Sequence, residues 1–140
     1  MTLSKGLFSS NSPEWETPKD FFDKVNAKYS FTYDLACTPA NQLCPNGLYD
    51  SLIEDWHKLN GWLWLNPPYG RVLSIWVKKA YEESVLGAKI IMLIPARTDT
   101  SYWHNYIFNK AAQIDFIKGR LKFSGKAGAP FPSALIRYEI

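Results

Sequence analysis

The hydrophobic positions along this chain form two kinds of block, stripes at helical spacing and short continuous runs. Stripes with apolar residues three and four positions apart predict amphipathic helices that bury one face. Thr17 and Pro18 are typical of the N-cap and first position of a helix, and Gly87 is typical of a helix end. The pattern predicts helices at 17–29, 72–86 and 100–110, and one or two helical turns at 52–58.

The continuous apolar runs predict strands that are buried on both faces. The run at 62–65 leads directly into Asn66, and the run at 89–94 ends at Pro95. The predicted strands are 31–37, 62–65, 89–94, 113–118 and 133–140, with a Pro-, Asn- and Gly-rich loop at 38–50.

Strands that alternate with amphipathic helices predict an α/β fold with a mainly parallel sheet covered on both faces. The last two strands are joined by a Gly- and Pro-rich loop without a helix, so we expect them to pair antiparallel. In an open sheet of this kind, ligands bind beyond the carboxyl ends of the strands. Asp34, Asn66 and Pro95 each lie at such an end, and we expect them to surround one crevice.

Length and composition describe one folded domain. The 140 residues include 46% hydrophobic and 21% charged side chains, which is typical of a globular protein. We expect an irregular arm at residues 1–13 and a single domain at residues 14–140. No apolar run is long enough to span a membrane, and residues 1–15 lack the apolar stretch of a secretory signal. The pattern therefore favours a cytoplasmic protein with no membrane partner.

The net charge and the spacing of the cysteines limit the kinds of ligand that the sequence predicts. The net charge of +3 permits contact with a polyanion, but no block of five like charges forms a basic tail. The two cysteines and two histidines lack the paired spacing of zinc ligands, so we expect no metal site and two reduced thiols. The aromatic content of 16% is a better guide to the ligand than the net charge, because Trp and Tyr beside polar loops often form a stacking surface for a planar ligand.

The segment Asn66-Pro67-Pro68-Tyr69 carries the most specific chemical pattern. Each proline fixes its own φ and biases the preceding residue toward extended backbone, so the segment is stiff. The Asn66 side-chain oxygen and the Pro67 carbonyl then become fixed acceptors beside the Tyr69 ring. Two acceptors beside a ring suit a planar group with an NH2, such as the amino edge of adenine. Since Asn-Pro also opens ordinary turns, the pattern alone leaves a turn and a binding site equally open.

A set of motifs in fixed order resembles one family. Asn66 to Tyr69 after an apolar strand looks like the catalytic motif of amino-group methyltransferases that use S-adenosylmethionine. The wider set resembles the phage-type DNA N6-adenine methyltransferase (Dam) family over residues 14–138. The segments that carry this resemblance are WETP at 15–18, YDLAC at 33–37, DW at 55–56, WLNPPYG at 64–70, Trp76, LIPARTDT at 93–100, Trp103, GRLKF at 119–123 and APFPSAL at 129–135.

This resemblance implies a small Rossmann-like methyltransferase domain that lacks some strand–helix units of full-length methyltransferases. It implies transfer of a methyl group from S-adenosylmethionine to the N6 amino group of adenine in double-stranded DNA. Asn66 and the Pro67 carbonyl would accept hydrogen bonds from that amino group, next to Pro68. Tyr69 would stack on an adenine that has left the duplex. The implied setting is a bacterial host cell, with the protein encoded by a phage or prophage.

The same resemblance implies a cofactor site at the end of the first strand. Its candidate residues are Trp15, Thr17, Pro18, Asp34, Ala36 and Asp50. Three of them have structural alternatives, because Asp34 can cap its loop, Thr17 a helix and Asp50 the turn that follows it. The usual Gly-rich loop after the first strand is absent, so residues 38–56 or a second subunit must supply the pocket for the adenine of the cofactor.

Basic side chains in the later loops are the candidates for DNA contact, namely Arg97, Arg120, Lys122 and Lys126. Phosphate contacts are numerous and individually replaceable, and a loop lysine is often simply solvated. A homodimer is left open. Two other functions also stay open. One is an amino-group methyltransferase that acts on RNA or on protein glutamine, and the other is a catalytically inactive DNA-binding relic.

Overall fold

The computed structural model describes residues 15–123 and 127–140, so the predicted arm at 1–13 lies outside the described residues. Within the described ranges, six strands form one sheet in the order β2-β1-β3-β4-β6-β5. The strands are β1 Tyr33–Asp34, β2 Asn46–Gly47, β3 Trp62–Leu65, β4 Lys89–Pro95, β5 Gln113–Phe116 and β6 Ser133–Tyr138. The helical elements are α2 Lys19–Tyr29, the 3-10 helices η2 Ser51–Ile53 and η3 Trp56–Lys58, α3 Leu73–Val85 and the π-helical turn η4 Trp103–Ile107.

The sheet is mixed and mostly parallel. β2, β1, β3 and β4 run in one direction. β6 is antiparallel to both of its neighbours, β4 and β5. The structure therefore confirms the predicted α/β class and the predicted antiparallel pairing of the last two strands.

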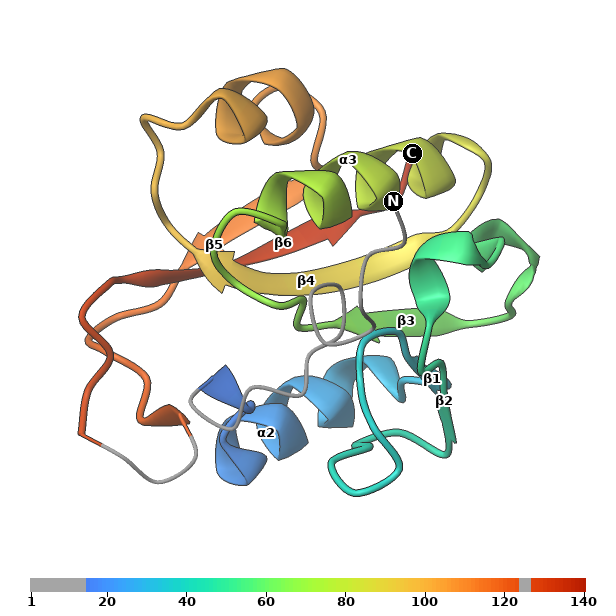
Figure 1. The fold of residues 1–140 in the computed structure, drawn as a ribbon, viewed down its shortest axis with the longest axis horizontal. Helices are drawn as coiled ribbons and strands as arrows, with labels where there is room; N and C mark the ends of the chain where they lie inside the picture. Colours follow the sequence, from blue (N-terminus) through green and yellow to red (C-terminus); the bar gives the residue numbers. More distant parts are fainter. Residues whose placement is uncertain (1–14, 124–126) are drawn as a thin grey trace.

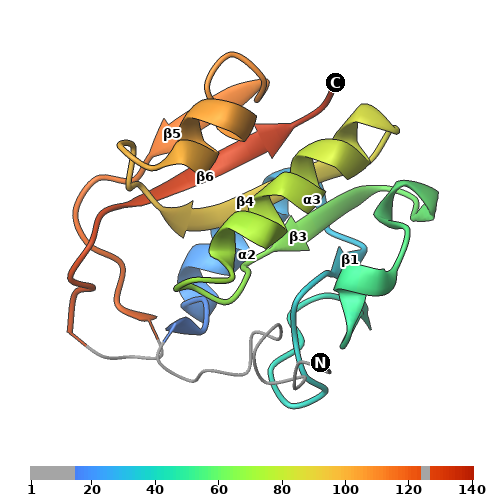
Figure 2. The ribbon, with the colours of Figure 1, turned by 45° about the horizontal axis from the view of Figure 1, so that its top comes forward.

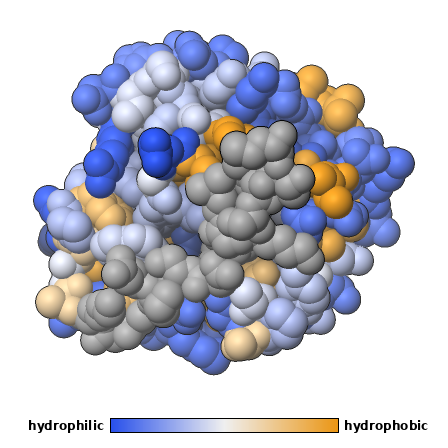
Figure 3. Space-filling model, viewed as in Figure 1, coloured by the Kyte–Doolittle hydropathy of each residue, from blue (hydrophilic) through white to orange (hydrophobic). Residues whose placement is uncertain are grey.

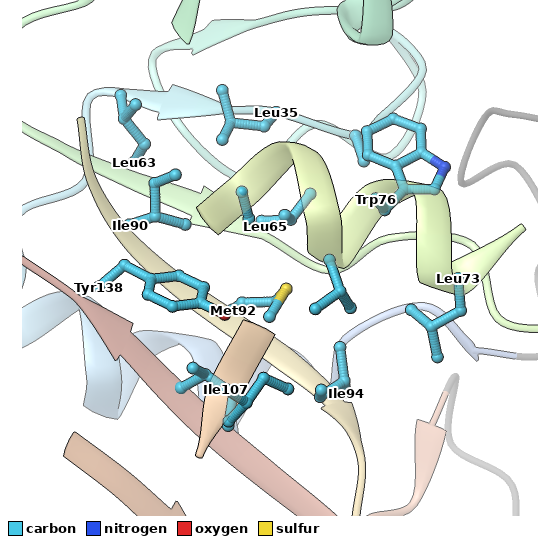
Figure 4. Packing of buried hydrophobic residues seen from close by; sticks show 14 of the residues in the cluster. Leu35, Leu63, Leu65, Leu73, Trp76, Ile90, Met92, Ile94, Ile107 and Tyr138 are labelled. Carbon is cyan, nitrogen blue, oxygen red and sulfur yellow. The ribbon is translucent and has the colours of Figure 1, made fainter. Parts of the chain in front are cut away.

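The two longer helices cover opposite faces of this sheet. Figure 2 shows α3 in front of the strands and α2 behind them. Successive side chains of a strand point to opposite faces, so Ile90, Met92 and Ile94 of β4 pack in the cluster with α3. Ile91 and Leu93 pack in the cluster with α2. Figure 4 shows the α3-side cluster from close by. Because both faces are covered, β3 and the part of β4 after Lys89 need apolar side chains at every position.

Three predicted elements differ from the structure. The predicted strand at 31–37 is reduced to β1, because the Asp34 carboxyl accepts hydrogen bonds from the backbone after it and turns the chain out of the sheet. The predicted loop at 38–50 contains an edge strand, β2, that pairs with β1. The predicted helix at 100–110 is mainly the π-helical turn η4, and the chain turns away at Asn109, whose φ of +65° stops a helix.

Most of the large apolar side chains are buried in the two core clusters. In the view of Figure 1, the surface drawn in colour is mostly hydrophilic, and its hydrophobic residues lie in separate small groups (Figure 3). Over the part of the chain that the structure describes, no helix has both the length and the apolar character that crossing a membrane requires.

Candidate active site

The carboxyl ends of β1, β3 and β4 meet at one edge of the sheet, which we call the catalytic edge. Asp34 pairs with Trp64, one residue before the end of β3. Because the three strands are parallel, the chain leaves all of them on this side, at Asp34, Asn66 and Pro95. β5 also ends and β6 begins there, so the loop that connects them leaves the sheet at the same edge (Figure 1). The structure confirms that these chain ends gather at one edge.

Asn66 is held in one orientation by residues from the start of the described chain. Its side chain is buried, and its Nδ2 donates to the Trp15 carbonyl at 2.8 Å and to Thr17 Oγ1 at 2.9 Å. Since a carbonyl only accepts, the amide nitrogen must face Trp15. Asn66 Oδ1 is buried and has no hydrogen-bond partner among residues 15–123 and 127–140. A buried acceptor without a partner costs about 1–3 kcal/mol, so a ligand N–H at this oxygen would recover that cost.

Thr17 does not have the capping role that its sequence context predicts. α2 begins at Lys19, and its N-cap residue is Pro18, which has extended backbone and no side-chain cap hydrogen bond. The Thr17 hydroxyl instead accepts the hydrogen bond from Asn66. Asn66 is thus bonded to Thr17 and Trp15, which lie 49 and 51 positions before it in the sequence. No local pattern in the sequence signals these contacts.

The residues after Asn66 form the rest of the stiff segment. Pro67 is buried and Pro68 is half-buried. Gly70 follows with a φ of +102°, a conformation that favours glycine, and turns the chain toward α3. The order of strand, Asn66, two prolines and a tight turn is the local structure that the sequence predicts.

Tyr69 lies in a group of four rings, Trp15, Tyr69, Phe123 and Phe131, which we call the aromatic group. The Trp15 ring is stacked against Tyr69 with centroids 6.2 Å apart, and Phe123 and Phe131 meet Tyr69 edge-on. The Tyr69 hydroxyl donates to the Leu93 carbonyl at 3.1 Å. Burial raises the pKa of Tyr69 well above its usual value, so this hydroxyl stays protonated. Phe123 and Phe131 are buried, so only the half-buried rings of Trp15 and Tyr69 are partly exposed, and three of the four rings come from outside the Asn66–Tyr69 segment.

Asp34 is almost completely buried, with 3% of its surface exposed. One carboxyl oxygen accepts from the Ala36 backbone at 3.3 Å and the other from the Leu43 backbone at 3.1 Å. Burial raises the pKa of Asp34 to about 7, although these hydrogen bonds act in the opposite direction. Asp34 therefore shapes the loop after β1, which is the alternative role noted above. A contact with a cofactor stays a prediction for Asp34 and for the buried Ala36.

Asp50 has the opposite character. It is exposed and occupies the N-cap position of η2, yet its side chain makes no cap hydrogen bond. The next residue, Ser51, donates from its hydroxyl to the Leu35 carbonyl and so fixes this part of the loop beside the end of β1. The capping alternative for Asp50 is therefore wrong, and its exposed carboxylate is available to a ligand.

The predicted DNA-contacting residues are divided by the structure. Arg97 is exposed, and its guanidinium lies 5.6 Å from the centre of the Phe131 ring, which links it to the aromatic group. Arg120 and Lys122 are exposed in the loop at the catalytic edge, where Arg120 also donates to a carbonyl of the same loop. Lys126 lies outside the described residues.

Sequence reasoning missed one cluster of polar side chains. Asp55, His57 and Glu83 offer ligand-type atoms that lie within 4.8 Å of one another. His57 Nδ1 is 2.7 Å from a Glu83 oxygen, and Lys79 and Lys58 pair with the carboxylates of Glu83 and Asp55. Although burial raises the pKa of Glu83, its hydrogen bonds from His57 hold it below the usual value. With every carboxylate paired, the cluster is an ion-pair network that joins η3 to α3.

Fold and site together define an α/β domain with an Asn-Pro-Pro-Tyr segment at the carboxyl edge of a mostly parallel sheet. The sequence model of the DNA N-6-adenine-methyltransferase (Dam) family matches residues 6–132, and the chain belongs to this family. The chain is also 31% identical over 120 residues to the "DNA N-6-adenine-methyltransferase" of Escherichia phage T1. This aligned stretch covers 80% of this chain and 50% of that relative. The chain thus spans about half the length of this curated relative. No solved structure matches the chain significantly.

Proposed function

We propose that this chain transfers a methyl group from S-adenosylmethionine to the N6 amino group of adenine in double-stranded DNA. Membership of the Dam family and the name of the phage relative support this reaction. The buried Asn66 Oδ1 is the observation that assigns this reaction to a site. The hydrogen bonds of Asn66 Nδ2 fix the orientation of the amide, and Oδ1 has no partner among the described residues.

The chain's own residues position the amino group of the base. S-adenosylmethionine, when bound, supplies a methyl group that is already activated for transfer. Asn66 Oδ1 accepts one N6 hydrogen and the Pro67 carbonyl accepts the other, which directs the nitrogen lone pair away from both oxygens. The same two oxygens stabilise the positive charge that develops on the nitrogen, because they are fixed before the reaction. The methylated nitrogen then releases one proton to water, which leaves neutral N6-methyladenine. Asn66 cannot rotate its amide without losing the contacts to Trp15 and Thr17.

The residues near the end of β1 fit a cofactor with hydroxyl groups. The exposed Asp50 carboxylate would accept hydrogen bonds from the cofactor ribose, and Asp34 shapes the loop after β1. The segment Trp15 to Pro18 contacts Asn66 and would border the reactive end of the cofactor. The parallel strands β1, β3 and β4, with the site at their carboxyl ends, support the interpretation as a reduced Rossmann-like domain.

Target adenine has to leave the duplex to reach Asn66. The base then stacks against the half-buried Trp15 and Tyr69 rings, which the buried Phe123 and Phe131 hold in place. Arg97, Arg120 and Lys122 contact phosphates of the duplex at the catalytic edge. The place of action is the bacterial cytoplasm, where the DNA lies. Residues 38–56 or a second subunit of a homodimer supply the pocket for the adenine of the cofactor.

The test is transfer of labelled methyl groups from S-adenosylmethionine to a panel of duplex DNA, RNA and protein, followed by identification of the methylated nucleoside. Wild-type protein and the exposed control Asn105→Ala are expected to produce N6-methyladenine in DNA. Asn66→Ala is expected to lose about 10²–10³-fold in rate, as for other fixed groups that stabilise charge in a transition state. Methylation of RNA or protein alone would contradict the DNA assignment. Cofactor binding without transfer to any substrate would show an inactive relic.

A further inference from the structure

A pocket of 180 Å³ lies where α2 meets β4 and β6, away from the catalytic edge. Lys24 and Lys28 of α2 and Arg137 of β6 line it, together with the apolar side chains of Ile91 and Leu135. We call this the α2–β6 pocket. It combines three basic side chains with an apolar wall, and the proposed reaction uses none of them.

Strand register places the pocket apart from Asn66. Arg137 pairs with Ile91 of β4, four residues before Pro95 at the catalytic edge. A strand rises roughly 3.3 Å per residue, so the pocket lies about 13 Å along β4 from that edge. The pocket is also on the α2 face, since Ile91 packs in the cluster with α2. It is therefore a separate site on the same side as the segment Trp15 to Pro18, from which α2 continues.

The basic side chains of the pocket lack anionic partners. Over the described ranges, Lys24, Lys28 and Arg137 form no ion pair, and the buried Arg137 Nε has no hydrogen-bond partner. Asp115 also lines the pocket, but its carboxylate accepts from Gln113 Nε2 at 2.8 Å and 3.0 Å. Two ammonium groups and a guanidinium around one small space are suited to a phosphate. A buried donor without a partner, at Arg137, points to the same kind of ligand.

We propose that the α2–β6 pocket binds a phosphate group of the DNA backbone in the duplex that flanks the target adenine. This proposal rests on the proposed function. The pocket is smaller than the roughly 300–1,000 Å³ of typical small-molecule sites, which favours a phosphate with part of its sugar over a whole nucleotide. Its apolar wall packs against the sugar. For a duplex that runs along β4 from the catalytic edge, about 13 Å corresponds to about four base pairs at about 3.4 Å per base pair.

The test measures binding of a fluorescent duplex by anisotropy at several salt concentrations. Arg137→Gln and Lys28→Gln are each expected to weaken binding roughly tenfold at low salt and to reduce the salt dependence by about one counterion. Lys78→Gln removes the same charge from the exposed surface of α3 and is expected to change neither quantity. Asp115→Asn is expected to strengthen binding, because it removes the one negative charge from the pocket. This opposite sign separates a phosphate site from a general loss of folding.

Duplexes trimmed on either side of the target sharpen the test. Wild-type protein is expected to lose the same tenfold when one flank becomes shorter than about four base pairs, and Arg137→Gln is expected to be insensitive to that trimming. The proposal would be overturned if Arg137→Gln and Lys28→Gln behave like Lys78→Gln both in the affinity for the duplex and in its salt dependence. A second result would also overturn the proposal: calorimetry shows that inorganic phosphate binds the wild type but not Arg137→Gln, while DNA binding is the same in both. The pocket would then bind a free phosphate compound. Methyl transfer at saturating DNA should stay at the wild-type rate in Arg137→Gln. Absence of transfer by the wild type would refute the proposed function instead, while the binding data still decide the pocket.

Discussion

Replacing Thr17 with valine removes the hydroxyl that accepts a hydrogen bond from Asn66 Nδ2 at 2.9 Å and keeps the shape of the side chain. The amide keeps its bond to the Trp15 carbonyl at 2.8 Å, so it is loosened rather than released. A neutral hydrogen bond contributes about 1 kcal/mol net. If that energy serves to hold Asn66 Oδ1 toward the base, losing it lowers kcat about fivefold.

The assay separates a positioning role for Thr17 from the cofactor contact that the sequence predicts for it. Steady-state methyl transfer to duplex DNA is measured at varied S-adenosylmethionine. Positioning through Asn66 predicts a lower kcat with an unchanged KM for S-adenosylmethionine, and full recovery in Thr17→Ser, which restores the hydroxyl. A wild-type kcat in Thr17→Val, or a higher KM for the cofactor as its only defect, would refute a positioning role for Thr17.

Three further outcomes follow from the buried polar groups. Asp34 has a folded-state pKa of about 7 against an ordinary 3.8, so its contribution to stability is complete below about pH 4 and is lost as the pH rises through 7. Denaturant unfolding at pH 5 and pH 8 should show a decrease of about 3 kcal/mol, from the part of the pKa shift that lies above pH 5, and this decrease should be absent in Asp34→Asn. Glu83→Gln should lower the free energy of unfolding by about 2 kcal/mol, because it breaks a buried ion-pair network, whereas the exposed Glu82→Gln should have little effect in the same unfolding experiment. Tyr69→Phe loses the hydrogen bond to Leu93 and should lower the thermal midpoint slightly while it keeps methyl transfer, and Tyr69→Ala should lose transfer, as a rate assay on both variants would show.

Local patterns in the sequence were enough to predict the central part of the fold. The run at 62–65 and residues 90–94, which follow Lys89, are apolar at every position, which is the pattern of strands with both faces covered, and the structure confirms both strands. Parallel strands leave the sheet at the same edge, so the gathering of Asp34, Asn66 and Pro95 also followed from the order of elements. The stiffness of the two prolines is a covalent property, and no tertiary contact is needed to predict it.

Tertiary structure alone decided which way the side chains face and what they contact. The partners of Asn66 Nδ2 lie 49 and 51 residues away, and only their packing leaves Oδ1 free. Burial by surrounding elements raises the pKa of Asp34 to about 7, and no local pattern encodes that burial. The basic α2–β6 pocket joins a helix near the start of the chain to its last strand. Periodicity and capping act over a few neighbouring residues, whereas hydrogen bonds, burial and charge between distant segments depend on how the folded chain brings them together.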